Sequence, residues 1–310
     1  MNSRLFLYSA FFFVTILLYD AYSYREQIAA PVDDVMDETA KSPPETDNTD
    51  ETTDNQLYTD DSVSDVNENL TEKTIDVESD NLILRISLQD GSIVRAELKN
   101  FKESFGGDKN VVLLDKDNLG YSASSDIQFN KPMLVGEYTA SKQNFLADAY
   151  PFTVSIISDN EQFTITKKYT FFGDSHLINV ENKVYNKSRN PIKARYYNTI
   201  QRGEDLSSNV MLYTYTGAAY YDYENKFNKI SFDDIADRNL QLKTESSWIS
   251  MLEHYFFSAW ISTKDSAQTI YTRNLSSSKV GPSYLVGSVS DYLTILEDSS
   301  KTFSSQLYVG

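Results

Sequence analysis

The uncharged stretch Leu5–Tyr19 constrains the architecture of this chain more than any other feature of its sequence. It contains fifteen residues, and twelve of them are large apolar or aromatic side chains. Beyond Asp20, residues Ala21–Tyr24 extend it to Leu5–Tyr24, which is about the 20 residues that a bilayer-spanning helix needs. We therefore predict one N-terminal transmembrane helix within residues 1–25, and the rest of the chain on one side of the membrane.

The charges on either side of this stretch predict its orientation. Arg4 and the N-terminal amine precede it, whereas an acidic tract follows it. Because positive charge stays on the cytoplasmic side of a membrane, we expect the N-terminus inside and the bulk of the chain outside. A cleaved signal peptide is the alternative, since Ala21-Tyr22-Ser23 has small residues at the spacing that a signal peptidase recognises.

Residues 26–79 have the composition of a disordered acidic linker. Between Asp33 and Glu78 there are sixteen acidic residues and two lysines, a net charge of −14 out of the −17 of the whole chain. Such a segment buries too little apolar surface to offset the entropy lost on ordering, and its like charges extend it. As a coil of about 50 residues it would span roughly 40 Å. So acidic a chain is also a poor candidate for binding nucleic acid.

From Asn81 onward, apolar residues alternate with polar ones, which is the period of a half-buried strand. The turn signal Asp90-Gly91 separates two such runs, so residues 81–99 are predicted to form an antiparallel hairpin. In the run Phe163–Phe171, the threonines and lysines are predicted to face outward. Further strand-like runs follow at 111–114, 152–156, 176–185, 194–201, 247–262, 268–275, 283–296 and 303–309. This series predicts a mainly β fold, either a sandwich or a barrel. Because no second linker interrupts it, we favour one large two-sheet antiparallel β-sandwich over residues 80–310.

The aromatic run Trp248–Trp260 is the one ambiguous segment of this domain. Its apolar residues fit one face of a helix, yet they also fit two strands that turn at Glu253-His254. Because aromatic residues favour strands, we predict a hairpin whose aromatic side chains pack in the core.

The sequence carries no recognisable catalytic or metal-binding motif. There is no cysteine, so disulfides and thiolate metal sites are excluded. The two histidines, His176 and His254, lack further ligands at a metal-binding spacing. His254 beside Glu253 is the one acid–base pair worth testing. We therefore predict no catalytic, cofactor-binding or metal-binding residues.

Two other groups of residues, adjacent carboxylates and a run of tyrosines, could suggest binding sites, but we predict ordinary structural positions for both. Adjacent carboxylates are expected by chance in a chain with 45 acidic residues, and we predict that they face water. These pairs are Glu204-Asp205, Asp233-Asp234 and Glu297-Asp298. A run of tyrosines is predicted to pack within strands, with binding of a sugar or a protein as the alternative. These tyrosines are Tyr213, Tyr215, Tyr220, Tyr221 and Tyr223.

Three motifs follow one another in the second half of the chain: the Gly-Ala-Ala-Tyr stretch Gly217–Tyr220, the stretch Lys229–Ile235, and the Trp-x-x-Met-x-x-x-Tyr-Phe-x-x-Ala-Trp stretch Trp248–Trp260. In this order they resemble the large periplasmic domain of the bacterial membrane insertase family YidC. The closing residues Leu307–Gly310 fit the same layout, as do the predicted anchor and linker. The resemblance covers nearly the whole chain, although the linker matches only in character.

This resemblance implies a galactose-mutarotase-like β-sandwich in the periplasm of a Gram-negative bacterium, held at the inner membrane. It implies a protein that helps newly made inner-membrane proteins insert and fold, alone or with components of the Sec translocon, without enzymatic turnover. The family's core of five further transmembrane helices has no counterpart here, so this chain is expected to anchor and position rather than insert alone. The alternative is a sugar-binding or carbohydrate-active β-sandwich protein, secreted or membrane-anchored.

Overall fold

The computed structural model describes residues 73–203, 215–224, 226–245, 247–263, 267–278 and 281–310. The predicted anchor Leu5–Tyr24 and the predicted linker up to residue 72 lie outside these described ranges. Within the described ranges, no helix has the length and apolar character of a membrane span.

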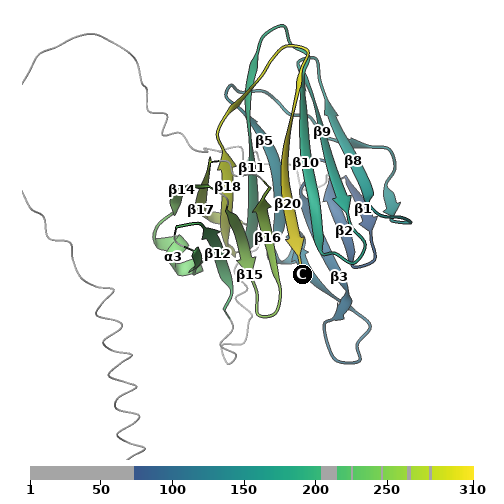
Figure 1. The fold of residues 1–310 in the computed structure, drawn as a ribbon. Coiled ribbons are helices and arrows are strands. Elements are labelled where there is room, and N and C mark those ends of the chain that lie inside the picture. Colours follow the sequence, from purple (N-terminus) through teal and green to yellow (C-terminus); the bar gives the residue numbers. More distant parts are fainter. Residues whose placement is uncertain (1–72, 204–214, 225, 246, 264–266, 279–280) are drawn as a thin grey trace, which may run out of the picture. The chain divides into compact units, whose positions relative to one another are not determined.

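The described residues form two large β-sheets that pack face to face (Figure 1). Sheet A has eleven strands in the order β14-β17-β18-β11-β5-β3-β2-β1-β7, with β19 paired to β11 and β4 paired to β3. Its strands are β1 (Thr74–Glu78), β2 (Leu82–Ser87), β3 (Ile93–Lys102), β4 (Asn110–Asp115), β5 (Ser122–Phe129), β7 (Asn144–Leu146), β11 (Ile192–Gly203), β14 (Gln241–Glu245), β17 (Ala267–Ser278), β18 (Gly281–Ser290) and β19 (Leu293–Ile295).

Sheet B has nine strands in the order β13-β12-β15-β16-β20-β10-β9-β8-β6. They are β6 (Thr139–Ala140), β8 (Phe152–Asp159), β9 (Phe163–Phe171), β10 (Leu177–Asn186), β12 (Gly217–Asp222), β13 (Lys226–Ile230), β15 (Trp248–Leu252), β16 (Phe257–Ser262) and β20 (Ser300–Val309). Apart from the parallel contact of β1 with β7, the strand pairs of both sheets are antiparallel. The predicted two-sheet sandwich is therefore confirmed.

The alternation seen in the sequence places every second side chain in the core between the sheets. Strands β8, β9 and β10 alternate buried and more exposed residues along most of their length. Each fully buried large apolar side chain stabilises the fold by about 1.5–3 kcal/mol relative to an exposed one. The two sheets are thus held together chiefly by this continuous apolar layer.

Both predicted hairpins are present. Strand β2 pairs with β3, and Gly91 in the connecting turn has a φ of 72°, a conformation that strongly favours glycine. Strand β15 pairs with β16 from Trp248 opposite Ile261 to Leu252 opposite Phe257. The hairpin prediction for Trp248–Trp260 is thereby confirmed, and Trp260 lies in the core as expected, only 2% exposed. The prediction that the aromatic side chains of this hairpin pack in the core is wrong for Tyr255 and Phe257, which are 80% and 38% exposed because they lie in the turn and at the outward first position of β16.

Two further predictions need correction. Strand β1 lies within the segment predicted as linker, because Ile75 and Val77 are buried against β2 while charged residues alternate with them. The predicted boundary at residue 80 is therefore too late, and ordered structure includes Thr74–Glu78. Lys167 was predicted to face outward, yet it occupies an inward position of β9 and is fully buried.

Two short helices connect strands. Helix α2 (Lys116–Leu119) joins β4 to β5, and α3 (Phe232–Asp237) joins β13 to β14. Ser231 caps α3 by accepting a hydrogen bond from the Asp234 N–H, while the Asp234 carboxylate accepts from the Ser231 N–H. The Phe232 ring stacks on Tyr284 at 4.5 Å between centroids, which fixes the helix against β18.

Candidate functional site

The aromatic residues at one end of the sandwich form the most extended candidate site. At the end where β20 finishes (the lower end in Figure 1), five rings make a continuous chain of contacts. Phe256 contacts Phe101 at 5.3 Å, Phe101 contacts His176 at 6.2 Å, His176 contacts Tyr308 at 6.2 Å, and Tyr308 stacks on Phe257 at 4.7 Å. We call these five residues the aromatic rim.

The aromatic rim is assembled from distant parts of the sequence. Phe101 comes from β3, His176 from the turn before β10, and Tyr308 from β20, whereas Phe256 and Phe257 come from the β15–β16 hairpin. Beside the rim lies a hollow of about 230 Å³, lined by Tyr215, Lys229 and residues 252–257. The hollow is small and open, and its lining includes Glu253 and His254, the acid–base pair suggested by the sequence.

His176 is a packing residue of this rim. Its Nδ1 lies 2.8 Å from the Val309 carbonyl oxygen, and its own carbonyl accepts a hydrogen bond from the Val309 N–H. The ring is thus held by an ordinary hydrogen bond and by its contacts with Phe101 and Tyr308.

The acid–base pair suggested by sequence, Glu253 and His254, is not a matched pair in the structure. The Glu253 carboxylate forms an ion pair with Nη1 of Arg202, which lies at the end of β11. The His254 ring instead packs on Tyr255 with centroids 3.8 Å apart. Their neighbouring positions therefore do not create a general acid and base aimed at one point.

Arg202 is the centre of a polar cluster that no local pattern in the sequence indicates. Its guanidinium lies 4.9 Å from the ring centroid of Tyr121, and the Tyr121 hydroxyl lies 2.8 Å from Ser258 Oγ. Burial raises the pKa of Tyr121 far above its usual value, although Arg202 opposes that shift. The cluster joins β11 to the β15–β16 hairpin, and its contacts identify it as a structural tie.

A second buried cation, Lys167, lies under the β2–β3 turn. Its ammonium group donates a hydrogen bond of 2.7 Å to the Asp90 carbonyl and lies 3.9 Å from Asp126 Oδ1. It also sits 5.0 Å from the ring centroid of Tyr138, whose buried hydroxyl has no hydrogen-bond partner among the described residues. Tyr169 donates its hydroxyl hydrogen to the Gly91 carbonyl. The one feature of the sequence that pointed to this cluster is the position of Lys167 in β9, where it falls on the side of the strand that carries the buried residues.

The carboxylate pairs do not gather into a site. Asp234 of the pair Asp233-Asp234 caps α3, and hydrogen bonds from Ser231 lower its pKa. Glu297-Asp298 lies on the surface in the turn before β20, whereas Glu204-Asp205 is outside the described residues. Across the described part of the chain, no group of three or more histidine and carboxylate side chains is placed to hold a metal ion.

The run of tyrosines is divided between different environments. Tyr220 lies in the core, while Tyr221 stacks on Trp248 at 6.0 Å on the other face of sheet B. The Tyr215 hydroxyl donates to the Ala218 carbonyl, and burial raises the pKa of Tyr215 to about 12. Tyr223 is exposed, and Tyr213 is outside the described residues. These tyrosines therefore do not form one binding patch.

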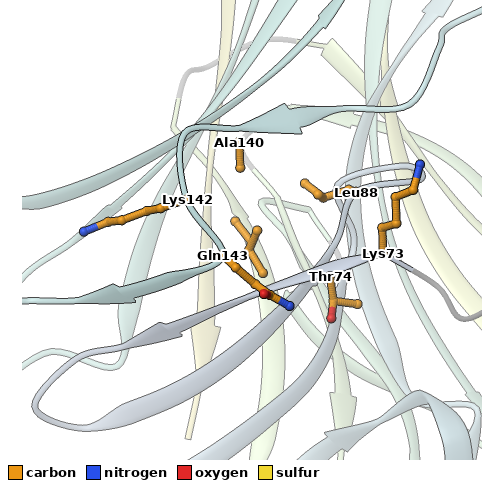
Figure 2. A pocket seen from close by; sticks show the side chains of 7 residues that line it. Lys73, Thr74, Leu88, Ala140, Lys142 and Gln143 are labelled. Atoms are coloured by element: carbon orange, nitrogen blue, oxygen red, sulfur yellow. The ribbon is translucent and has the colours of Figure 1, made fainter.

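A larger hollow of about 530 Å³ lies at the start of β1 (Figure 2). Its two lysines point away from the hollow: Lys73 forms an ion pair with Glu137, and Lys142 lies over the ring of Phe145. Because its charged groups are engaged elsewhere, this hollow offers little chemistry for a ligand.

Comparison with known proteins places this architecture in context. Residues 74–310 match the family described as the YidC periplasmic domain. The chain is 30% identical over 245 residues to the membrane protein insertase YidC of Haemophilus ducreyi, covering 77% of this chain and 45% of that protein. It is 32% identical over 244 residues to that of Methylobacillus flagellatus, covering 76% and 43%. An alignment with the protein of Mannheimia succiniciproducens, at 25% identity, covers 100% of this chain and 56% of that one.

The chain thus spans about half the length of the curated relatives that it matches. Among solved structures, it is similar to the galactose mutarotase related enzyme from Lactobacillus acidophilus, with a TM-score of 0.50 and 9% identity over 76% of this chain and 97% of that one. At so low an identity this likeness concerns the fold alone, and it confirms the predicted galactose-mutarotase-like sandwich.

Proposed function

Since the chain belongs to the YidC periplasmic domain family, we propose that it is the N-terminal part of a membrane protein insertase that assists insertion and folding of newly made inner-membrane proteins. The observation that carries this proposal is the family match over residues 74–310. The relatives are named membrane protein insertases, and their names describe no enzyme.

The proposed organisation has three parts. Residues 1–25 form a single transmembrane anchor in the inner membrane, and the acidic segment from residue 26 to residue 73 tethers the sandwich in the periplasm. The length and apolar character of Leu5–Tyr24 support the anchor, and the net charge of −14 between Asp33 and Glu78 supports an extended tether. The folded domain then occupies residues 74–310.

The proposed partners are newly made inner-membrane proteins, components of the Sec translocon, and the lipid bilayer through Leu5–Tyr24. In this arrangement the sandwich contacts and positions its partners. Moving a polar segment into lipid requires a protein-lined path, because lipid offers its backbone no hydrogen-bond partners. One anchor and a β-sandwich do not supply such a path, so insertion requires further membrane helices.

A carbohydrate-active protein is the weaker alternative. Its fold would be similar, but fold alone does not give function. The Glu253 carboxylate is ion-paired with Arg202, and the His254 ring packs on Tyr255. Among the described residues, no acid–base pair therefore favours sugar chemistry. We propose that the chain has no catalytic, cofactor-binding or metal-binding residues.

Complementation tests the proposal. Residues 1–310 expressed in cells depleted of their own insertase should fail to restore growth, whereas a hybrid that joins Gly310 to a complete five-helix insertase core should restore it. The matched control is the same core without residues 1–310, with the membrane abundance of each protein measured by immunoblotting. Growth restored by residues 1–310 alone would contradict the division of labour.

A further inference from the structure

We propose that the aromatic rim and the neighbouring tip of the β3–β4 loop contact the headgroup region of the membrane. This inference rests on the proposed function, because it requires a domain that is held close to an inner membrane. It adds a specific surface: the end of the sandwich at which Phe101, Phe257 and Tyr308 meet.

The first observation is the exposure of aromatic side chains at this end. Phe105 is fully exposed, Tyr255 is 80% exposed, and Phe101 and Phe257 are exposed by 43% and 38%. Large apolar side chains are costly to leave in water, because their burial is favourable roughly in proportion to the apolar area removed from water. Burial of these rings against a partner would recover that free energy.

The second observation is the shape of the β3–β4 loop. This loop projects beyond the ends of the neighbouring strands (Figure 1, lower end). Gly107 donates a backbone hydrogen bond to Ser104, and Gly106 has a φ of 75°, so the chain turns sharply beside Phe105. Lys102 fixes the base of the loop through hydrogen bonds to the Asp108 carbonyl and to Asn110. Phe105 is thereby presented at the tip of a braced loop.

The chemistry of the rim favours a lipid surface. Exposed Phe and Tyr rings come there from the end of β3, the β3–β4 loop and the β15–β16 hairpin, and a hollow of only about 230 Å³ lies beside them. A protein partner would need well-packed, fully desolvated pockets for anchoring side chains. A membrane interface instead accepts many protruding amphipathic rings at the level of the headgroups.

Charge plays a smaller part in this contact. Lys102 and Lys109 flank the loop tip and would attract anionic headgroups, but Glu103 and Asp108 lie in the same loop and offset them. We therefore assign the main attraction to the aromatic side chains, with weak dependence on salt.

The absence of cysteine from the sequence makes a direct test possible. Ser104→Cys places a unique attachment point beside Phe105, and Tyr223→Cys places one at the β12–β13 turn, where the native side chain is 75% exposed. Each full-length variant is labelled with an environment-sensitive fluorophore and reconstituted into vesicles of phosphatidylethanolamine and phosphatidylglycerol. We expect a blue-shifted emission and quenching by headgroup-level nitroxide lipids at position 104, and neither at position 223.

A second variant tests whether the Phe105 ring causes the blue shift and the quenching at position 104. Adding Phe105→Asp to Ser104→Cys should abolish the blue shift and the quenching, while the melting temperature stays the same because Phe105 is fully exposed. Equal exposure to water at positions 104 and 223 in vesicles would overturn the proposal. Protection of position 104 that appears only when an inner-membrane client protein is added would also overturn it, and would identify a protein-binding surface. Complementation by the hybrid does not use this readout, so failure of one test is distinguishable from failure of the other.

Discussion

Two buried cations, Lys167 and Arg202, are accommodated in this sandwich by different means. The Arg202 guanidinium has a carboxylate in direct contact, Glu253, and an aromatic ring beneath it. The Lys167 ammonium binds a peptide carbonyl directly, and its nearest carboxylate, Asp126, is 3.9 Å away. Each cation ties a turn of one hairpin to the opposite sheet. The comparison shows that a buried charge is held either by a counter-charge in direct contact or mainly by a backbone carbonyl, and the two cations should respond differently to mutation.

Truncation of a core side chain gives the loss of stability against which mutations near the two cations can be compared. Trp260 is 2% exposed and donates its indole N–H to the Thr199 carbonyl at 3.0 Å. Trp260→Ala should therefore lower the free energy of unfolding by about 3–5 kcal/mol, through lost burial and the cavity left behind. Urea unfolding followed by circular dichroism measures it. Trp248→Ala is the matched control, and since Trp248 is only partly buried it should cost less. An unchanged unfolding midpoint for Trp260→Ala would place that side chain outside the core.

The directly paired cation should depend strongly on its counter-charge. Glu253→Gln keeps the shape of the side chain but removes the charge facing Arg202, which is itself almost fully buried. We expect a loss of about 2 kcal/mol, the size of a hydrogen bond between charged groups. Glu297→Gln, at an exposed carboxylate, is the control and should change stability little. If both variants unfold alike, the Arg202–Glu253 contact contributes nothing and the contrast between the two cations disappears.

Lys167 should depend on the β2–β3 turn, which supplies the Asp90 carbonyl that its ammonium group binds. Gly91 has a φ of 72°, and a Cβ added there would lie 2.7 Å from Lys167 Nζ. Gly91→Ala should cost about 1–2 kcal/mol from the left-handed backbone alone. Gly106→Ala is a matched control, because Gly106 also has a positive φ of 75° but no atom within 4 Å of the added Cβ. A larger loss for Gly91→Ala than for Gly106→Ala isolates the contribution of Lys167, and equal losses would show that its position is not constrained by the turn.

The sequence predicts the strands of this fold better than its polar clusters, for physical reasons. Hairpins such as residues 81–99 are encoded locally, by alternation and by a turn signal that needs glycine. Strand β1 was missed because its two buried residues, Ile75 and Val77, stand among acidic neighbours. Strand β5 was missed for a related reason, since Ala123 and Ser125 supply little hydrophobic contrast at its inward positions.

The clusters are encoded by contacts that no local pattern contains. Arg202 and Glu253 meet because β11 and the β15–β16 hairpin end at the same place in the fold. Lys167 was misassigned because lysine was expected to face water. Its position, an even number of residues from Phe163 and Tyr169, places it on the same inward face of the strand. The aromatic rim likewise joins Phe101 to Tyr308 through tertiary structure alone.

The contribution of Asp126 to the pH dependence of stability is the sharpest test of the comparison between the two buried cations. Burial raises the pKa of this carboxyl above its usual range, with Lys167 opposing the shift only in part. The folded protein therefore holds this proton more tightly than the unfolded chain. The resulting stability is fully present below the unfolded pKa of about 3.9 and is lost as the pH rises through the folded pKa.

Asp126→Asn removes this titration. Relative to the parent, the variant should gain stability as the pH rises from the unfolded pKa through the folded pKa, and at neutral pH it should be at least as stable as the parent. Urea unfolding of both proteins at a series of pH values measures the difference, and Glu297→Gln again controls for loss of a surface carboxylate. Should the parent instead gain on the variant as the pH rises, the ionised Asp126 carboxylate would be a net stabilising partner of Lys167. Both buried cations would then be held by a carboxylate. The distance of 3.9 Å between Lys167 Nζ and Asp126 Oδ1 would stabilise the fold as well as a direct contact does.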